Sequence, residues 1–232
     1  MFRFQWLLVF PRFYAFLCSH RRSVNYEKQL YLRTIKRGDI VLDLGANVGY
    51  YSILFSRLCG KKGSVHCFEP VMETYQSLLL SLRGLKNTKV NNLAVGEKET
   101  MMKINLDPAN SEKSTLLKIN SPKSENVKVL PIDTYVKEQK LSKVDFIKCD
   151  VEGYELQALL GMRETLSINQ PKISIEITLL HKERRELISY LINLGYDTFL
   201  KVEKGYPTYD PNFDSEPENS YFYLYATCSH NT

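Results

Sequence analysis

The chain alternates short runs of β-branched and apolar residues with longer segments of helical periodicity, beginning at about residue 38. The runs IVLDL at 40–44 and SVHCF at 64–68 are each followed by a segment whose apolar residues recur every three or four positions. Strands that alternate with helices form βαβ units, in which a parallel sheet is covered by helices on both faces. We therefore predict one α/β domain with a doubly wound, Rossmann-like fold and a mostly parallel, seven-stranded sheet.

The individual elements follow from the same periodicity. We expect strands at 40–44, 64–68, 89–93, 144–149, 173–177, 196–202 and 221–226, and helices at 48–58, 71–82, 154–162 and 181–194. Residues 97–131 break the pattern because they are polar and rich in Lys, Ser and Asn. We predict a loop-rich insertion there, between the third and fourth strands, with short extended pieces at 101–106 and 127–130. Loops of this kind often carry specificity in α/β enzymes.

The distribution of charge separates a leader at 1–37 from an α/β domain at 38–232. The 232 residues carry a net charge of +5, but residues 1–40 alone hold eight basic and two acidic side chains, so the remainder is close to neutral. A cleft that tracks phosphates normally needs a positive surface. Nucleic acid is therefore not an expected partner of the domain.

The leader is aromatic as well as basic and reads MFRFQWLLVFPRFYAFLC. Gln5, Pro11 and Arg12 interrupt its apolar runs, whereas a membrane span needs roughly 18 consecutive apolar residues. Two alternatives remain: the leader forms a helix or strand that packs against the domain or against a second subunit of a homo-oligomer, or it makes peripheral contact with a membrane surface. The five cysteines include no C-x-x-C pair, which favours a reducing, cytoplasmic location.

The strongest local motif is VLDLGANVGYYS at 41–52, in which a strand runs through a glycine turn into a helix. Glycines allow a ligand to approach the backbone closely, and Gly45 and Gly49 are placed for this. The motif is neither the G-x-G-x-x-G of dinucleotide folds nor a phosphate-binding P-loop. Glu69 ends the next strand, where a carboxylate can accept hydrogen bonds from both hydroxyls of a ribose. The two features together predict a nucleoside-binding site.

A third motif, VDFIKCDVEGYELQALLGM, occupies 144–162. Asp150 falls at the carboxyl end of the fourth strand, and Glu152 follows where the chain turns into a helix. Ligands of open α/β sheets bind outside the carboxyl ends of the strands, at the point where the strand order reverses. We therefore predict that Asp150 and Glu152 lie beside the reacting end of the cofactor.

These motifs, in this order, resemble the FkbM family of S-adenosylmethionine-dependent methyltransferases over residues 39–177, and DVEG at 150–153 is the most family-specific element. NNLAVGEKE at 91–99, LPIDTYV at 130–136 and PKISIEI at 171–177 add to the resemblance. It implies a class I methyltransferase domain that binds S-adenosylmethionine. By this resemblance Asp43, Gly45, Asn47 and Gly49 hold the methionine part, Glu69 the ribose, and Asn92 and Ala94 the adenine edge.

The resemblance also implies O-methylation of a hydroxyl on a sugar, a glycolipid or another small molecule. A hydroxyl needs a general base within hydrogen-bond reach, and the candidates are Asp150, Glu176 and His181. In-line methyl transfer requires no metal, and none is expected. Tyr206, Tyr209 and Tyr221 are available to stack on sugar rings. An RNA methyltransferase and a non-enzymatic binding protein that keeps the fold are the alternatives.

Overall fold

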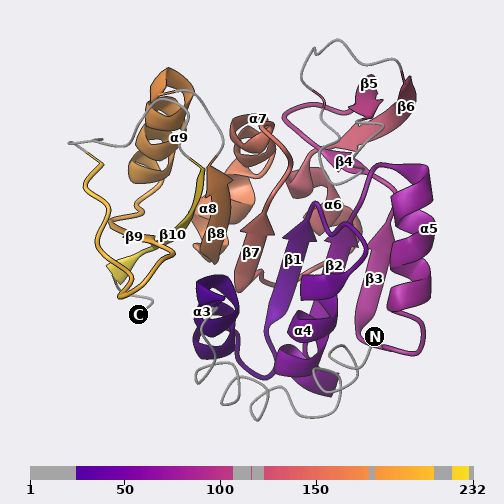
Figure 1. The fold of residues 1–232 in the computed structure, drawn as a ribbon, viewed down its shortest axis with the longest axis horizontal. Helices are drawn as coiled ribbons and strands as arrows, with labels where there is room; N and C mark the ends of the chain where they lie inside the picture. The colour runs from indigo at the N-terminus through magenta and orange to yellow at the C-terminus, as the bar shows by residue number, and fades with distance from the viewer. Residues whose placement is uncertain (1–24, 107–115, 117–122, 178–180, 212–220, 230–232) are drawn as a thin grey trace.

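The computed structural model describes residues 25–106, 116, 123–177, 181–211 and 221–229, and its centre is a seven-stranded sheet (Figure 1). The strands are β1 (Ile40–Leu44), β2 (Ser64–Phe68), β3 (Thr88–Asn91), β7 (Phe146–Cys149), β8 (Lys172–Ile177), β9 (Thr198–Lys201) and β10 (Phe222–Thr227). Their order across the sheet is β3-β2-β1-β7-β8-β10-β9, and only β10 runs antiparallel to its neighbours. The predicted mostly parallel, doubly wound sheet is confirmed.

The register of the central strands brings three separate motifs to one edge of the sheet. Leu44, the last residue of β1, pairs with Phe68 of β2 on one side and with Cys149 of β7 on the other. The three strands therefore end level with one another. The residue that follows each strand, namely Gly45, Glu69 or Asp150, begins a loop at the same edge. The strand order reverses between the neighbouring strands β1 and β7, which is where open α/β sheets bind ligands.

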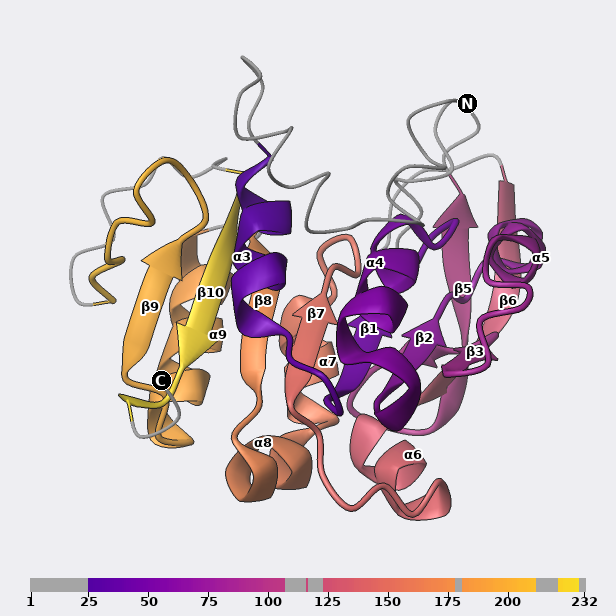
Figure 2. The same ribbon diagram turned by 90° about the horizontal axis from the view of Figure 1, so that it is seen from below.

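Helices cover both faces of this sheet (Figure 2). One layer holds α3 (Tyr26–Thr34), α4 (Tyr50–Cys59) and α5 (Met72–Ser81), which share a core cluster with Val41. The opposite layer holds α6 (Ile132–Glu138), α7 (Glu155–Leu160), α8 (Arg163–Asn169) and α9 (His181–Asn193), which pack on Leu42 and Leu44. Side chains of a strand alternate between the faces, so a continuous apolar strand such as β1 supplies both cores.

Helix α3 belongs to the segment that the sequence assigns to the leader, and it packs directly on the sheet. The fully buried Tyr31 ring lies edge-on to Tyr51, Phe55 and Phe146, and its hydroxyl is 3.1 Å from Ser174 Oγ on β8. The predicted subunit or membrane contacts of the leader concern residues 1–24, which lie outside the described residues. In the part of the chain that is described, no helix is both long and apolar enough to cross a membrane.

The described part of the segment at 97–131 is more regular than the predicted loop-rich insertion. A second sheet, of order β4-β6-β5, contains β4 (Ala94–Val95), β5 (Thr100–Leu106) and β6 (Lys123–Leu130). The whole of β5 pairs antiparallel with residues 123–129 of β6, and the buried residues Ile104 and Leu106 alternate with more exposed ones. The expected extended pieces are confirmed, but the loop-rich interpretation is wrong for β5 and β6. A sheet buried on one face contains many polar residues, and this composition resembles that of a loop.

The remaining differences concern boundaries. The predicted helix at 154–162 is shorter, ending at Leu160, and a turn separates it from α8, which the sequence analysis did not anticipate. Helix α6 was likewise not predicted. It begins directly after Pro131, and its first-turn Asp133 accepts hydrogen bonds from the backbone N–H groups of Glu164 and Thr165, which begin α8. The two short helices are therefore specified by a contact between segments distant in sequence.

Candidate active site

A cavity of about 350 Å³ lies at the carboxyl ends of β1, β2, β7 and β8. This volume is within the range of small-molecule sites. Lys148 is the single basic residue among the described residues that line it, against five acidic ones: Asp43, Glu69, Asp150, Glu152 and Glu176. The cavity wall is therefore strongly acidic, and the second sheet contributes an apolar part through Ile104.

The glycine turn after β1 forms one wall. Gly45 has a φ of +75°, and a Cβ built on it would lie 1.7 Å from the backbone oxygen of Asp150. The turn and the end of β7 thus touch backbone to backbone, an approach that only glycine permits. The N–H groups of Gly45 and Ala46 donate to Phe68 O at 3.1 and 2.9 Å. The turn is consequently held by β2 as well as by β7.

Asp43 is buried beneath this turn, with 1% of its surface exposed. Its Oδ2 accepts a hydrogen bond from Ser52 Oγ at 2.5 Å, whereas its Oδ1 has no hydrogen-bond partner among the described residues. Burial raises the pKa of Asp43, and the nearby Lys148 opposes this effect. A buried acceptor without a partner at a cavity wall is suited to a donor group on a bound ligand.

Glu69, which follows β2 directly, is also buried. Its Oε2 accepts from the Asn47 N–H at 3.1 Å, and its Oε1 accepts from the Val71 N–H at 3.0 Å. Burial raises the pKa of Glu69 to about 7, although the two backbone hydrogen bonds act in the opposite direction. Glu69 therefore connects the glycine turn to the start of α5 while still lining the cavity.

Lys148 and Asp150, both from the end of β7, form a buried ion pair. Lys148 Nζ is 2.6 Å from Asp150 Oδ2, and only 2% of the Lys148 side chain is exposed. Burial alone would lower the pKa of Lys148, but the charges of Asp150 and Asp43 raise it above its ordinary value. Burial would likewise raise the pKa of Asp150, and the Lys148 ammonium lowers it. The face to which the Lys148 side chain points depends on its place in β7, because strand residues alternate between faces.

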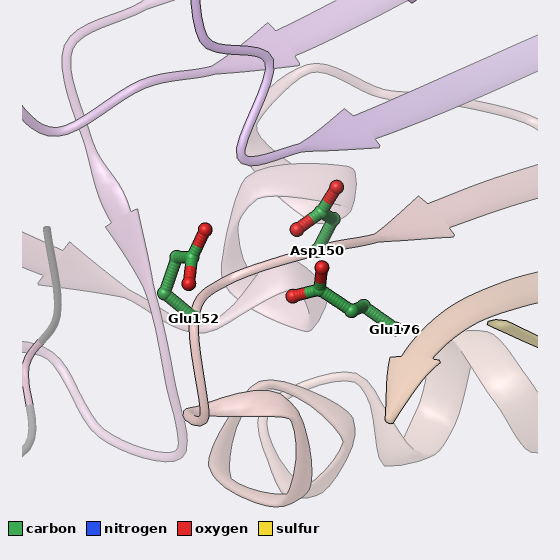
Figure 3. Close-up of side chains that lie close together, drawn as sticks. All are labelled: Asp150, Glu152 and Glu176. Carbon is green, nitrogen blue, oxygen red and sulfur yellow. The ribbon is translucent and has the colours of Figure 1, made fainter. Parts of the chain in front are cut away.

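Glu176 at the end of β8 faces Asp150 (Figure 3). The hydroxyl of Tyr223 on β10 bridges the two carboxyls, donating to Asp150 Oδ2 at 3.0 Å and lying 3.4 Å from Glu176 Oε1. Burial and the neighbouring Asp150 charge raise the pKa of Glu176. Two carboxyls this close disfavour a state in which both are ionised, unless a proton or a cation lies between them. The sequence predicted both carboxyls at the site, but it missed Tyr223.

Glu155 shapes the loop that carries Glu152. The Glu155 side chain is fully buried at the start of α7, and its Oε1 accepts the N–H groups of Val151 and Gly153 at 3.2 and 3.0 Å. These amides flank Glu152, which has a φ of +54°. Sequence reasoning missed Glu155, although an acidic residue two positions after DVEG, at a helix start, is the signal that could have identified it.

Helix α3 reaches the same site from outside the segment that carries the motifs. Glu27 accepts hydrogen bonds from the hydroxyls of Tyr31 and Tyr51 at 3.0 and 2.9 Å, and Tyr51 lines the cavity. Lys148 Nζ lies 5.4 Å from the centre of the Tyr51 ring. Glu27 thus connects the N-terminal helix to the buried ion pair. No local motif marks it in the sequence.

Comparison with known proteins identifies the family. The model of the methyltransferase FkbM domain matches residues 43–198, which is more than half of the chain. The chain belongs to the FkbM methyltransferase family. Its match to the hexuronic acid methyltransferase AglP of Haloferax volcanii is 26% identical over 162 residues, which are 69% of this chain and 66% of the relative. The chain thus spans just under two thirds of that relative's length.

Two solved structures share the fold of this FkbM methyltransferase. The FkbM methyltransferase of Methylobacillus flagellatus superimposes with a TM-score of 0.54 at 18% identity, covering 97% of this chain and 58% of its own. A SAM-dependent O-methyltransferase of Thermotoga maritima gives a TM-score of 0.50 at 13% identity, covering 93% and 70%. The predicted Rossmann-like methyltransferase fold and the predicted family are both confirmed.

The family is one of methyltransferases, and the cavity of this chain fits their methyl donor, S-adenosylmethionine. Asp43 Oδ1, which has no partner among the described residues, can accept a hydrogen bond from the cofactor. Gly45 has no side chain that would keep a ligand away from the turn. Of the predicted cofactor-binding residues, most line the cavity: Asp43, Gly45, Asn47, Glu69, Ala94, Asp150 and Glu152. Membership of a methyltransferase family supports the predicted enzyme over the non-enzymatic alternative.

Two predicted cofactor-binding residues of the FkbM methyltransferase do not line the cavity. Asn92 Nδ2 instead donates to the backbone oxygens of Glu69 and Pro70, at 3.0 and 2.8 Å. Gly49 lies against α5, where a Cβ would come within 2.8 Å of Leu78. The structure gives both residues a part in holding the walls of the site.

Among the predicted catalytic and aromatic residues, Asp150, Glu176 and Tyr221 line the cavity. His181 begins α9, and its side chain lies outside the described residues. Tyr209 is instead buried against Phe222, and the hydroxyl of Tyr206 donates to the backbone oxygen of Tyr26. The structure therefore brings only Tyr221 of the three tyrosines to the site.

Proposed function

We propose that this enzyme methylates a hydroxyl group of a sugar or of a sugar-containing acceptor such as a glycolipid. The observation that carries the proposal is the pair of carboxyls, Asp150 and Glu176, facing the cavity at the ends of adjacent strands. An oxygen nucleophile must lose its proton as it reacts, and a carboxylate within reach can accept it. The relative named as a hexuronic acid methyltransferase supports a sugar acceptor.

Such a transfer needs a base for the acceptor hydroxyl and residues that orient this base. S-adenosylmethionine supplies a methyl group on a positively charged sulfur. The acceptor oxygen forms a bond to that carbon, the carbon–sulfur bond breaks with its electron pair remaining on sulfur, and the hydroxyl proton passes to a carboxylate. We assign this carboxylate to Asp150, with Glu176 and His181 as the other candidate bases. Lys148 and Tyr223 fix the orientation of Asp150.

The cofactor contacts follow from the same cavity. We assign Asp43 Oδ1 to the amino group of the methionine part, because it is a buried acceptor without a partner among the described residues. We assign the Glu69 carboxylate to the ribose hydroxyls, since it lies directly across the glycine turn. Ala94 lines the neighbouring apolar wall and is assigned to the adenine.

The Glu69 assignment predicts a pH dependence of cofactor binding. Burial raises the pKa of Glu69 to about 7, so the carboxyl is mostly protonated at about pH 6 and ionised at about pH 8. Only the ionised form accepts hydrogen bonds through both oxygens. We expect S-adenosylhomocysteine to bind about tenfold more weakly at about pH 6 than at about pH 8, measured by calorimetry. Glu69→Gln should bind weakly at both pH values. An unchanged pH profile in this variant would refute the assignment.

We expect the acceptor sugar to stack on the ring of Tyr221. Its side chain is 63% exposed, and its ring stands edge-on to Tyr223 at 6.0 Å. An exposed aromatic ring at a cavity mouth offers an apolar face to the C–H groups of a sugar. Tyr221→Ala should raise the KM for the acceptor by about tenfold, and Tyr221→Phe should restore it, because the ring contributes about 1 kcal/mol. The affinity for S-adenosylhomocysteine should stay constant, and a loss of it in Tyr221→Ala would place the ring at the cofactor instead.

The acceptor class can be tested directly. The protein is incubated with S-adenosylmethionine carrying a labelled methyl group and with glycan, glycolipid and RNA fractions of its host. We expect label in a glycan or glycolipid fraction, as an alkali-stable methyl ether of a sugar. Label in RNA alone would refute the proposed acceptor and would favour the alternative of an RNA methyltransferase.

A further inference from the structure

Three carboxyl groups meet at the ends of β7 and β8, namely Asp150, Glu152 and Glu176 (Figure 3). One oxygen from each lies within 4.8 Å of the others. Two oxygens on opposite sides of a cation are separated by twice the metal–oxygen distance, which is about 4.2 Å for Mg²⁺ and about 4.8 Å for Ca²⁺. The upper limit on the spacing of the three groups is therefore compatible with ligands around one cation.

Glu176 provides an observation beyond the clustering of acids. Only 3% of its surface is exposed, and its Oε2 is buried without a hydrogen-bond partner among the described residues. Its carboxyl group points toward Asp150 in Figure 3. Leaving a buried carboxyl oxygen without a partner is unfavourable, and a bound cation at this place would satisfy it.

The charge balance favours a cation as well. Lys148 contacts Oδ2 of Asp150, which leaves the other oxygen of that carboxyl available. No second basic side chain lines the cavity among the described residues, so one ammonium faces the three carboxyls of Asp43, Asp150 and Glu176. The coordinating atoms are all carboxylate oxygens, which select hard cations such as Mg²⁺, Mn²⁺ or Ca²⁺ rather than Zn²⁺.

We propose that Asp150, Glu152 and Glu176 bind one hard divalent cation at the acceptor end of the cavity. Three protein oxygens leave coordination positions open, and neighbouring oxygens of an acceptor, such as a hydroxyl and a carboxylate of one sugar, can fill two of them. The role toward the acceptor rests on the proposed function, whereas binding of the cation does not. The inference departs from the sequence-based expectation that the site holds no metal.

The test uses the full chain, stripped with EDTA and exchanged into metal-free buffer, and Mn²⁺ as the probe. Free Mn²⁺ is followed by electron paramagnetic resonance during titration. We expect one saturable site from which Mg²⁺ displaces Mn²⁺. Glu152→Gln and Glu176→Gln should each weaken binding by about tenfold or more. Glu73→Gln, an exposed acid at the start of α5, is the control and should bind as the wild type does.

Several results would overturn the proposal. One is the absence of a saturable site at millimolar Mn²⁺. Another is wild-type Mn²⁺ binding by a folded Glu152→Gln variant. Glu152 is the better position for this test than Glu176, because its side chain is part-exposed and its replacement disturbs the fold less. Loss of Mn²⁺ binding when S-adenosylhomocysteine is saturating would show that the carboxyls serve the cofactor instead. Full methyl transfer in the presence of EDTA would refute a role for the cation in the reaction while leaving the methyltransferase assignment intact.

Discussion

Replacing Asp150 with alanine or asparagine should lower the rate of methyl transfer by at least about a hundredfold, because the acceptor loses its base. Asp150 is held in place by Lys148 Nζ at 2.6 Å and by the Tyr223 hydroxyl at 3.0 Å, so a change of this side chain removes an oriented group rather than a mobile one. The rate is measured as label transferred from S-adenosylmethionine to the acceptor fraction that the experiment above identifies.

The variant must be shown to fold, because Asp150 also neutralises a buried ammonium. Removing one member of a buried ion pair typically costs about 3–5 kcal/mol of the free energy of unfolding. The nearby Asp43 charge, which also raises the pKa of Lys148, should reduce this cost. We therefore expect a folded protein with a lower melting temperature that still binds S-adenosylhomocysteine.

Asp145 offers a matched control for Asp150. It lies just before the same strand, at the opposite edge of the sheet, where its Oδ2 accepts the Ile40 N–H and its Oδ1 pairs with Lys143. Asp145→Asn should transfer methyl at the wild-type rate. Wild-type turnover in a folded Asp150→Asn variant would remove Asp150 from the reaction.

The central sheet was predictable because its strands are marked by short local runs of apolar and β-branched residues. Strand β1 is buried on both faces, so its sequence is apolar except for Asp43, and its boundaries match the expected ones at 40–44. Parallel order then follows from the intervening helices. The second sheet was not predictable to the same degree, because β5 and β6 pair with each other across a segment of polar composition.

The candidate site likewise contains residues whose place could be predicted from the sequence and residues whose place could not. Gly45, Glu69 and Asp150 each follow a strand directly, and the carboxyl ends of parallel strands must meet, so their proximity follows from the topology alone. Lys148 and Tyr223 lie on strands, and their side chains point into the site only because of the register of those strands. Glu27 depends on how α3 packs through Tyr31, a contact between residues far apart in sequence. Local patterns carry no information about such contacts.

Gly45→Ala tests the contact between the glycine turn and β7, and we expect a large loss of both stability and cofactor binding. The new Cβ would lie 1.7 Å from the Asp150 backbone oxygen and 2.9 Å from its carbonyl carbon, so two stretches of backbone would have to separate. The φ of +75° adds strain for any L side chain. We expect the free energy of unfolding to fall by about 2–4 kcal/mol and the affinity for S-adenosylhomocysteine to fall by at least about a hundredfold.

Gly84→Ala separates steric overlap from backbone strain. Gly84 has a similar φ of +88°, but nothing lies within 4 Å of the position that its Cβ would take. This variant should lose only about 1 kcal/mol, the cost of the left-handed conformation, and should bind S-adenosylhomocysteine as the wild type does. Urea unfolding and calorimetry on the two variants give the comparison. If the Gly45 variant were no weaker in binding than the Gly84 variant, the turn would not be shaping the cofactor site, and the contact between Gly45 and Asp150 would matter only for the fold.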